Sequence, residues 1–509
     1  MHSSNHAPPP HREVLVPLLR FGLAAAAVAA VLIALAMTRA DVDLWGHIRF
    51  GTDINESGRI DDVDPYSFTS DRPWVNHEWL AEVLFATAWR AAGGAGLIAL
   101  KLACALGAIG FLHLRLRYAR VPAQVQFMLL GLALVGTLPR ITHVRPQLFS
   151  VLLFAALIFI LARAEHGPRI RLAWTVPLLT LWANLHGGWI VGLATVGLWT
   201  LGDAWQRRAE GWRACNGLGF AAAAALATLI NPYGIGLWAF LLETVRFGRE
   251  EIGEWGPVWE NPAVLLVWAM FCGLAIGAIV RGGRPRNPAT LIIPVMWGLA
   301  ALRVSRLDAF FALSVVGLLG PHLTWLFEGR QGARPSPVST PLRVLAIGIV
   351  LAAVLMIPPA RQAFTCVNVH APWWPEPEAV GFVQQHRLSG RVVTFFRWGE
   401  YAIWHLPRSL KVSMDGRRET VYSDGMVAGH VALYRGTDEG LRFLQGLQAD
   451  YIWFPRFLPV LESLRRAGWT TMFQGPSSVL LERPGRAGQL SPVASTALPE
   501  PRSRCFPGP

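Results

Sequence analysis

Long apolar segments separated by short polar loops fill the first 358 residues of the 509-residue chain. The apolar segments are residues 14–37, 95–114, 123–139, 147–162, 172–184, 187–204, 214–230, 263–280, 288–302, 307–327 and 342–358. A helix needs roughly 20 residues to cross a bilayer. The pattern therefore predicts an α-helical polytopic membrane protein with about eleven spans, several of them tilted or broken because their segments are short.

The polar residues are densest in the loop at residues 39–93, which follows the first apolar segment. At its end, residues 77–90 place apolar side chains on one helical face, so we expect an amphipathic helix lying in the membrane interface. Gly93 and Gly94 then break this helix before the next span.

After residue 358 the pattern changes to short strand and helix segments in alternation. This alternation predicts a small α/β domain over residues 359–483, with a largely parallel sheet and a final hairpin at residues 469–482. Residues 484–509 are rich in Pro, Ser, Arg and Gly and are expected to be disordered. The remaining expected units are a tail at residues 1–13 and a transmembrane domain at residues 14–358.

Composition agrees with a membrane protein: 53% of residues are hydrophobic and only 16% are charged. The net charge of +13 could point to nucleic acid, but the basic residues form short clusters between apolar segments rather than a continuous stripe. These clusters occupy alternate loops: Arg115, Arg117 and Arg120; Arg163, Arg169 and Arg171; Arg207, Arg208 and Arg213; Arg281, Arg284 and Arg286; Arg330, Arg334 and Arg343. By the positive-inside rule, these loops and the N-terminus face the cytoplasm, whereas the 39–93 loop and the α/β domain lie outside.

The five cysteines have no paired spacing for zinc. Only Cys366 and Cys505 lie outside the apolar segments and their edges, so one disulfide is possible.

Two acids stand where the first span meets the outer surface. Asp41 and Asp43 point the same way if the segment is extended. Such a pair can hold a divalent cation such as Mg²⁺, Mn²⁺ or Zn²⁺ together with His47, or one acid can act as a general base. The alternatives are a solvated loop whose acids only make turns, and a histidine that is only a structural hydrogen-bonding residue.

Arginines on the same outer side run against the positive-inside bias. They occur around Arg145 and again at Arg303 and Arg306, and guanidinium groups suit the phosphate of a polyprenyl phosphate lipid. Snorkelling or ion pairing with the loop acids is the alternative. Outer tryptophans could stack on sugars or anchor the protein at the interface; they are Trp45, Trp74, Trp182, Trp189, Trp255 and Trp259.

In the α/β domain, the stretches WGEYAIWHLP and VSMDGRRETVY are dense in sugar-binding side-chain types. Acceptor binding there competes with a structural interpretation, in which Asp415-Gly416 forms a turn and Arg417 pairs with Glu400.

The stretches DVDLWGHIRFG, DPYSFTSDRPWVNHEWLAEVLF, HVRPQLFSVLLF and LWANLHGGWIVGL resemble bacterial multi-pass glycosyltransferases of the GT-C fold, and the two C-terminal stretches resemble the extracytoplasmic domain of such proteins. The resemblance implies a protein of the bacterial inner membrane that uses a polyprenyl-phosphate sugar as donor. It also implies that an acid of the first outer loop, here Asp41 or Asp43, is catalytic. The chain departs from the pattern at Trp45-Gly46-His47, where relatives often have two tryptophans.

The predicted function is an inverting transfer of the sugar to an extracytoplasmic glycolipid, polysaccharide or protein. Besides the catalytic acids Asp41 and Asp43, the predicted substrate-binding residues are His47, Arg49, Asp64, His77, Glu78, Arg145, Asn184, His186, Arg303 and Arg306. A transporter or flippase for lipid-linked saccharides would ordinarily show repeated broken helices, which are not visible, and a non-catalytic cell-envelope assembly protein would not explain the acids.

Overall fold

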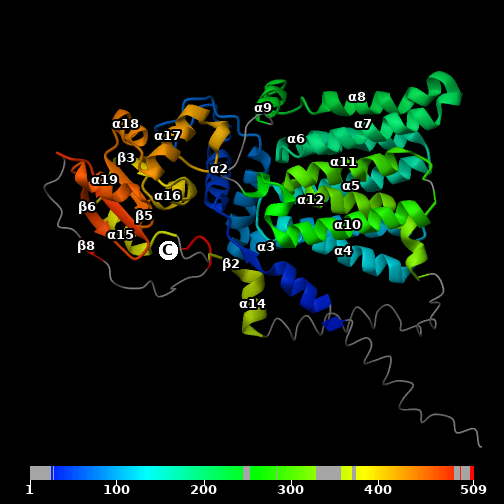
Figure 1. The fold of residues 1–509 in the computed structure, drawn as a ribbon, viewed down its shortest axis with the longest axis horizontal. Coiled ribbons are helices and arrows are strands. Elements are labelled where there is room, and N and C mark those ends of the chain that lie inside the picture. Colours follow the sequence, from blue (N-terminus) through cyan, green and yellow to red (C-terminus); the bar gives the residue numbers. More distant parts are fainter. Residues whose placement is uncertain are drawn as a thin grey trace, which may run out of the picture.

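The computed structural model describes residues 25–26, 28–244, 253–283, 285–327, 357–369, 374–485, 493–494 and 505–508. Two bodies lie side by side in Figure 1, a bundle of long helices and a smaller α/β domain. Half of the first predicted span, nearly all of the span predicted at residues 342–358, and the predicted 1–13 tail lie outside the described residues.

The bundle consists of helices that lie side by side and run back and forth along the horizontal axis of Figure 1. They are α4 (Ala123–Ile141), α5 (Gln147–Glu165), α6 (Thr175–Leu185), α7 (Trp189–Gln206), α8 (Asn216–Ala227), α10 (Pro262–Arg281), α11 (Ala289–Arg303) and α12 (Asp308–Ser314). Each lies within or closely matches a predicted apolar segment, and α12 continues into a π-helix and a 3₁₀-helix up to Phe327. Five helical segments in the described residues are long and apolar enough to cross a membrane.

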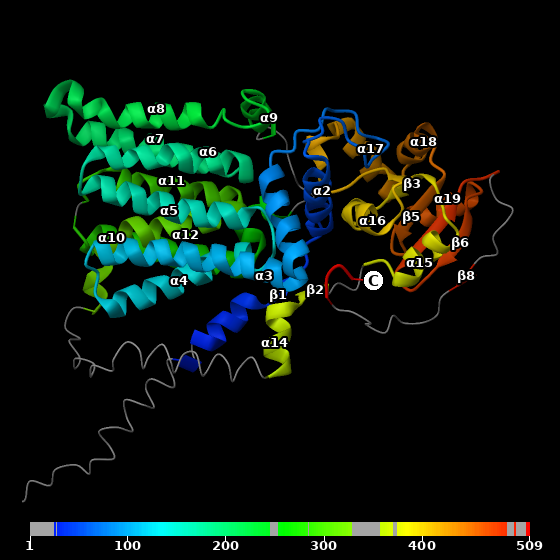
Figure 2. The same ribbon diagram turned by 180° about the vertical axis from the view of Figure 1, so that it is seen from behind.

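Helix α3 (Trp79–Tyr118) contains the predicted break. Ala92 and Gly93 depart from helical geometry, and Gly93 has a φ of 55°, which favours glycine. The part before the break lies across the end of the bundle with α2 (Leu44–Ser57), and the part after it runs along the bundle (Figure 2). This arrangement confirms a helix at the predicted place and its glycine break, whereas its position in the membrane interface stays a prediction.

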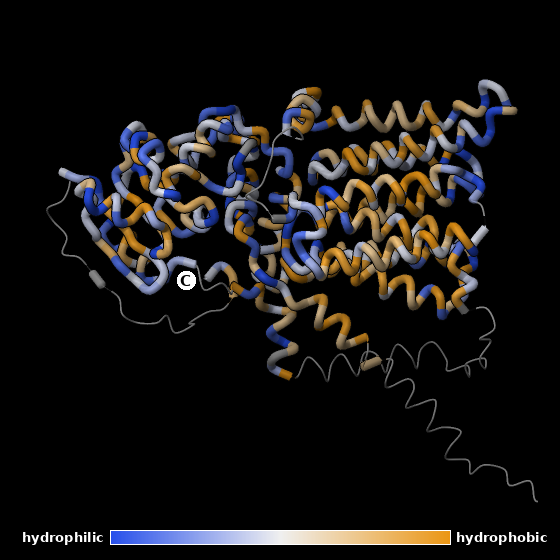
Figure 3. The backbone as a smooth tube through the Cα atoms, viewed as in Figure 1, coloured by the Kyte–Doolittle hydropathy of each residue, from blue (hydrophilic) through white to orange (hydrophobic). Residues whose placement is uncertain are grey.

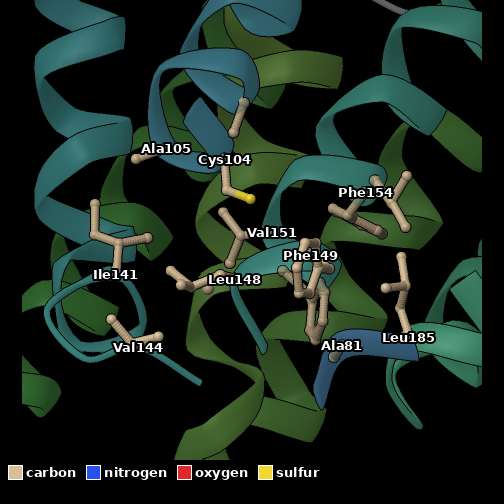
Figure 4. Close-up of a cluster of buried hydrophobic side chains, with 14 of the residues drawn as sticks. Ala81, Cys104, Ala105, Ile141, Val144, Leu148, Phe149, Val151, Phe154 and Leu185 are labelled. Carbon is tan, nitrogen blue, oxygen red and sulfur yellow. The ribbon is translucent and has the colours of Figure 1, made fainter. Parts of the chain in front are cut away.

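Helix α5 is at the centre of the bundle core. It is apolar on all sides, which is the pattern of a helix surrounded by protein. Figure 4 shows its Leu148, Phe149, Val151 and Phe154 among buried side chains of α3, α4 and α6. In Figure 3 the bundle is mainly orange, whereas its loops and the surface of the α/β domain are bluer.

The α/β domain has a six-stranded sheet in the order β4-β3-β5-β7-β6-β8. Its strands are β3 (Gly390–Thr394), β4 (Leu410–Val412), β5 (Tyr451–Pro455), β6 (Thr470–Gln474), β7 (Ser478–Glu482) and β8 (Val493–Ala494). The predicted hairpin is present as β6 and β7, but it pairs antiparallel with β5. The sheet is therefore mixed: β4-β3-β5 follows the parallel pattern that the strand–helix alternation predicts, and β6 also pairs parallel with β8, whereas β7 is antiparallel to both of its neighbours.

The helices of this domain are α15 (Pro377–Gln385), α16 (Gly399–His405), α17 (Asp424–Arg435), α18 (Asp438–Leu447) and α19 (Val460–Arg466). The alternation in the sequence places helices at residues 377–386, 398–407, 439–447 and 458–467, which match α15, α16, α18 and α19, but it places none at α17. The signals for α17 are the Ser423 side chain, which accepts a hydrogen bond from the Met426 N–H, and Gly436 in the left-handed region after its last residue.

The two ends of the described chain meet below the bundle. Strand β1 (Thr38–Arg39) pairs with β2 (Val367–Asn368), which follows α14 (Pro358–Thr365). Cys366 and Cys505 form the disulfide that was considered possible. The predicted disorder is wrong for residues 505–508, because Phe506 packs against Trp45 and the Pro507 carbonyl accepts a hydrogen bond from the Trp45 indole at 2.7 Å.

Candidate active site

The loop at residues 58–78 is packed against the α/β domain rather than exposed to solvent along its whole length. The Val412 N–H of β4 donates to the Tyr66 carbonyl at 3.2 Å, and the Phe68 N–H donates to the Val412 carbonyl at 3.0 Å. Farther along, the Val75 N–H donates to the Thr420 carbonyl. The loop thus extends the edge of the sheet and forms a seam between the two bodies of the molecule.

One side of this seam is a buried ion cluster. The Arg417 guanidinium donates to both carboxylate oxygens of Asp64 at 2.8 and 2.9 Å and to both of Asp415 at 2.9 and 2.7 Å. It also lies 4.9 Å from the ring centroid of Phe50. Asp64 was predicted to bind substrate, but both of its oxygens are occupied by Arg417. The expected pairing of Arg417 with Glu400 is likewise wrong, because Arg417 is paired with the two aspartates instead.

Asp41 and Asp43 have different surroundings. Asp41 is 6% exposed, and both of its carboxylate oxygens accept from the Arg145 guanidinium. Burial alone would raise the pKa of Asp41, but the charge and hydrogen bonds of Arg145 lower it. Asp43 stands half-buried at the start of α2, and its carboxyl makes no hydrogen bond within the described part of the chain. Burial and the negative charge of Asp41 raise the pKa of Asp43 to about 6.

His47 lies one turn into α2 and faces Glu82 of α3, with 3.5 Å between Nδ1 and Oε1. The Asn76 side chain donates to the other Glu82 oxygen at 2.6 Å. Burial alone would lower the pKa of His47, but its hydrogen bond to Glu82 and the charges of Glu78, Glu82 and Asp43 raise that pKa to about 9. His47 is therefore a cation near Asp43 at neutral pH.

Glu78 lies between two histidines. Its Oε1 is 3.7 Å from His77 Nε2 and 3.6 Å from His186 Nε2. His186 Nδ1 accepts the Gly188 N–H at 2.9 Å and lies 2.8 Å from Ser150 Oγ, so Nε2 is the nitrogen left to carry a proton toward Glu78. Burial lowers the pKa of His186 to about 3, so this imidazole is neutral at physiological pH.

The outer arginines form a second cluster beside the acids. Arg145 Nη1 donates to Glu254 at 2.8 Å, and Arg140 lies 3.2 Å from the other Glu254 oxygen. Arg140 also donates to Asp308 at 3.0 Å. Arg306 stacks over the Trp255 ring, 5.6 Å from its centroid.

The structure thus brings together most of the predicted site residues: Asp41, Asp43, His47, His77, Glu78, Arg145, His186 and Arg306. The other four lie apart from it: Asp64, which is bound by Arg417, and three more. Arg49 pairs with Asp53 at 3.1 Å and lines a cavity of about 410 Å³ on the far side of α2. The Asn184 side chain accepts from the Trp79 indole and donates to the Ile230 carbonyl, which is a structural role. Arg303 is exposed at the end of α11 and has no ion pair with any described residue.

The outer tryptophans are mostly neither sugar platforms nor interfacial anchors. Trp45, Trp74, Trp182 and Trp189 are at most 4% exposed and belong to the core. Trp259 is 54% exposed and keeps the predicted interfacial character.

The residues of the hypothetical metal site do not fit a cation in this arrangement. Both oxygens of Asp41 are engaged by Arg145, and His47 is paired with Glu82. Among the residues that the structure describes, no group of three or more His, Cys, Asp or Glu side chains is placed to hold a metal ion.

Two residues of the α/β domain reach the acids and were not predicted as part of the site. Glu400 of α16 accepts a hydrogen bond from the Gly46 N–H at 3.1 Å, and Gly416 lies against both Asp43 and Glu400. Glu254 and Glu82 were also missed. Their only sequence signal is that they are acids close to apolar segments, and this signal does not say which arginine or histidine they meet.

No protein-family model and no curated protein matches this chain. Solved structures do match it. The oligosaccharyltransferase of Archaeoglobus fulgidus superposes with a TM-score of 0.54 at 12% identity, over 85% of this chain and 69% of that one. ArnT from Cupriavidus metallidurans superposes with a TM-score of 0.54 at 13% identity, over 91% of this chain and 98% of that one. The mycobacterial arabinofuranosyltransferase AftD superposes with a TM-score of 0.53 at 13% identity, and the match covers 92% of this chain but only 40% of AftD. These neighbours are GT-C glycosyltransferases, and the likeness shows that this chain has the GT-C fold.

Proposed function

We propose that this protein is a membrane glycosyltransferase that moves a sugar from a polyprenyl-phosphate donor to an acceptor on the extracytoplasmic side. The observation that supports this most is Asp43: a carboxyl without a hydrogen-bond partner in the described residues, with a pKa near neutrality, beside a cluster of arginines. Solved structures with this fold have been obtained with undecaprenyl phosphate, for ArnT, and with dolichol phosphate, for the archaeal oligosaccharyltransferase.

Asp43 is a better candidate for the general base than Asp41. A base must be ionised, near the proton that it removes, and not already committed to another donor. Asp41 is committed to Arg145 at both oxygens, and its lowered pKa makes it a weak base. Asp43 is ionised above about pH 6 and has oxygens free to accept a proton.

The donor phosphate would be bound by the arginine cluster. Arg145 and Arg306 come from different loops and both interact with the charge of Glu254, so they lie around one anionic position. Glu254 is more exposed (32%) than Arg145 (22%) or Arg140 (5%). A phosphate, which accepts bidentate hydrogen bonds from guanidinium, can therefore replace this carboxylate at the arginines. Arg303, exposed at the end of α11, is the predicted additional contact on the lipid side.

In the proposed reaction, the acceptor hydroxyl attacks the anomeric carbon while Asp43 takes the hydroxyl proton. The new bond joins the acceptor oxygen to that carbon, and the bond to the phosphate oxygen breaks, with its electron pair leaving on the lipid phosphate. A single displacement inverts the anomeric centre. Arg145 and Arg306 stabilise the negative charge that develops on the leaving phosphate.

The arrangement also supports the predicted orientation. The arginine-rich turns after α3, α5, α7 and α10 lie at the end of the bundle away from the α/β domain (Figures 1 and 2). With those turns in the cytoplasm, the acids and the α/β domain are outside, where lipid-linked sugars and envelope acceptors meet.

The test uses the purified full-length protein in lipid, supplied with radiolabelled polyprenyl-phosphate sugars and a membrane glycolipid extract. We expect label transfer by the wild type, none by Asp43→Asn, and measurable transfer by Asp41→Asn, with a chelator lane to test the metal hypothesis. Transfer that survives in Asp43→Asn but is lost in Asp41→Asn would exchange the roles of the two acids. No transfer by folded wild-type protein from any donor would favour the flippase or assembly-protein alternative.

A further inference from the structure

Glu400 is a buried carboxyl that the proposed mechanism does not use. It lies on α16, 3% exposed, and reaches out of the α/β domain to the first turn of α2. Its Oε2 accepts the Gly46 N–H at 3.1 Å. A side chain at position 46 would overlap the Glu400 carboxylate, so the glycine allows this close approach.

Glu400 and Asp43 lie next to each other across the seam. A methyl group added to Gly416 would overlap Asp43 Oδ1 and would lie 2.8 Å from Glu400 Oε1. Two oxygens that both lie this close to one point are within about 6 Å of each other, a range in which charges shift each other's pKa. Oε1 of Glu400 therefore lies near the proposed base, while Oε2 accepts a hydrogen bond from the backbone of the helix that begins directly after that base.

The charges that surround Glu400 favour its neutral form. Asp43 precedes α2, Glu82 comes from α3, and Asp415 and Arg417 come from the loop after β4. Arg417 is the only cation among these four, and it is already bound to Asp64 and Asp415. Burial and the charges of Asp43 and Asp415 raise the pKa of Glu400 well above its usual value. A neutral carboxyl differs from a carboxylate in one useful respect, because its O–H can donate a hydrogen bond to Asp43.

We propose that Glu400 is a positioning residue for the transfer reaction: held by the Gly46 N–H, it donates a hydrogen bond to the Asp43 carboxylate and fixes that carboxylate in the orientation needed to accept the proton. The proposal rests on the proposed function, in which Asp43 is the base. It means that the α/β domain completes the active site of the membrane domain instead of only binding acceptor.

The decisive experiment compares Glu400→Gln with Glu400→Ala in the transfer assay, in full-length protein in lipid. Glutamine can accept from the Gly46 N–H and donate to Asp43, so Glu400→Gln should keep kcat within a few-fold of wild type. Alanine can do neither, and a misplaced base should lower kcat on the order of 10²-fold with KM nearly unchanged. Glu376→Gln is the control, because Glu376 is an equally buried glutamate of the same domain that binds Ser477 and Ser478 instead.

The pH profile separates this role from a merely structural one. In the wild type, kcat should fall at alkaline pH as Glu400 loses its proton and can no longer donate, and Glu400→Gln should not show this fall. Glu376→Gln should keep the wild-type profile. Wild-type kcat in Glu400→Ala, or the same alkaline fall in Glu400→Gln as in the wild type, would overturn the proposal while leaving the glycosyltransferase assignment intact.

An infrared titration reports the protonation of the Glu400 carboxyl directly, so it requires neither enzyme activity nor the alanine variant. Wild-type protein at neutral pH should show a protonated-carboxyl C=O band that disappears at alkaline pH and is missing in Glu400→Gln. Absence of this band in the wild type, or its loss on adding Mg²⁺ or Mn²⁺, would mean an ionised or cation-bridged pair and would overturn the proposal. If wild-type protein transfers no sugar but shows the band, the proposed function fails and the protonated pair remains.

Discussion

Two pairs of buried carboxyl groups cross the same seam between the membrane domain and the α/β domain, and they differ in charge balance. Asp64 and Asp415 share Arg417, which makes hydrogen bonds to all four of their oxygens. No arginine bridges Asp43 and Glu400 by hydrogen bonds among the described residues, and the pKa of each is raised even though the cations His47 and Arg145 lower that of Asp43 and Arg417 lowers that of Glu400. The first pair has no unmet hydrogen-bonding capacity and holds the seam together. The second can exchange or share a proton, which is what a reaction requires.

Structural and chemical acids can thus be told apart at this seam, where two acids come from the outer loop and two from the α/β domain. All four acids look alike as parts of the sequence, but a satisfied ion cluster and an unbalanced carboxyl pair respond oppositely to mutation. Removing a member of the Asp64–Arg417–Asp415 cluster should lower the stability of the protein, and removing Asp43 or Glu400 should lower its activity.

The largest expected effect is on catalysis. Asp43→Asn keeps the size of the side chain but cannot take a proton, so transfer should fall by about 10²–10⁴-fold, the contribution of a general base. The measurement is label transfer by protein that elutes normally from a sizing column. An Asp64→Asn variant that lost transfer equally while remaining folded would erase the distinction between the two pairs.

The next effect is on stability. Arg417→Met removes the cation from between Asp64 and Asp415, and leaving buried charges unpaired costs about 3–5 kcal/mol. We expect a large drop in the thermal unfolding midpoint of the detergent-solubilised protein at pH 7. A midpoint within error of the wild type would mean that the cluster does not hold the seam.

Asp43→Asn should at the same time stabilise the protein. The pKa of Asp43 rises from 3.8 to about 6 on folding, so its ionised form destabilises the folded state above that pH. The asparagine variant should be ~1–3 kcal/mol more stable at pH 7, and the difference should shrink as the pH falls below about 6 and vanish at about pH 3, where both states carry the proton. Denaturation curves at the two pH values test this, and equal stabilities at pH 7 would contradict a raised pKa.

A smaller effect is expected on the transfer rate when the pH is lowered. Since Asp43 must be ionised to act as base, kcat should fall about tenfold per pH unit below about pH 6. Asp41→Asn removes the negative charge that raises this pKa, so the midpoint of its profile should move to lower pH. The range from pH 5 to pH 7 extends about one unit on either side of the pKa of Asp43, and a kcat that is constant over this range would exclude Asp43 as the base.

The smallest effect is expected at the exposed edge of the seam. Arg408 pairs with Asp53 at 2.8 Å, but its side chain is 71% exposed. Arg408→Ala should change stability by less than about 1 kcal/mol, as exposed ion pairs usually do. It therefore serves as the matched control for Arg417→Met, and a loss as large as that of Arg417→Met would mean that charge number rather than burial stabilises the seam.

The sequence determined the features that depend on local pattern. Apolar segments of sufficient length predicted the bundle helices, Gly93 and Gly94 predicted the break in α3, and strand–helix alternation predicted the α/β domain. The outer acids and arginines were predicted to gather, because loops on one side of a membrane must lie near one another. The sequence also left one disulfide possible, between the two cysteines outside the apolar segments, and the structure contains it.

Only the tertiary structure decided which charges meet. Gly46 and Glu400 are 354 positions apart, and Arg417 and Asp64 are 353 apart. Helical and strand periodicities extend over a few residues and say nothing about contacts at such separations. Pairing and burial set whether an acid is a structural ion or a base, and both arise from packing the α/β domain onto the outer loop. For this reason the sequence did not show that Arg417 binds Asp64 or that Glu400 reaches α2, although both acids stand in stretches that it had already marked.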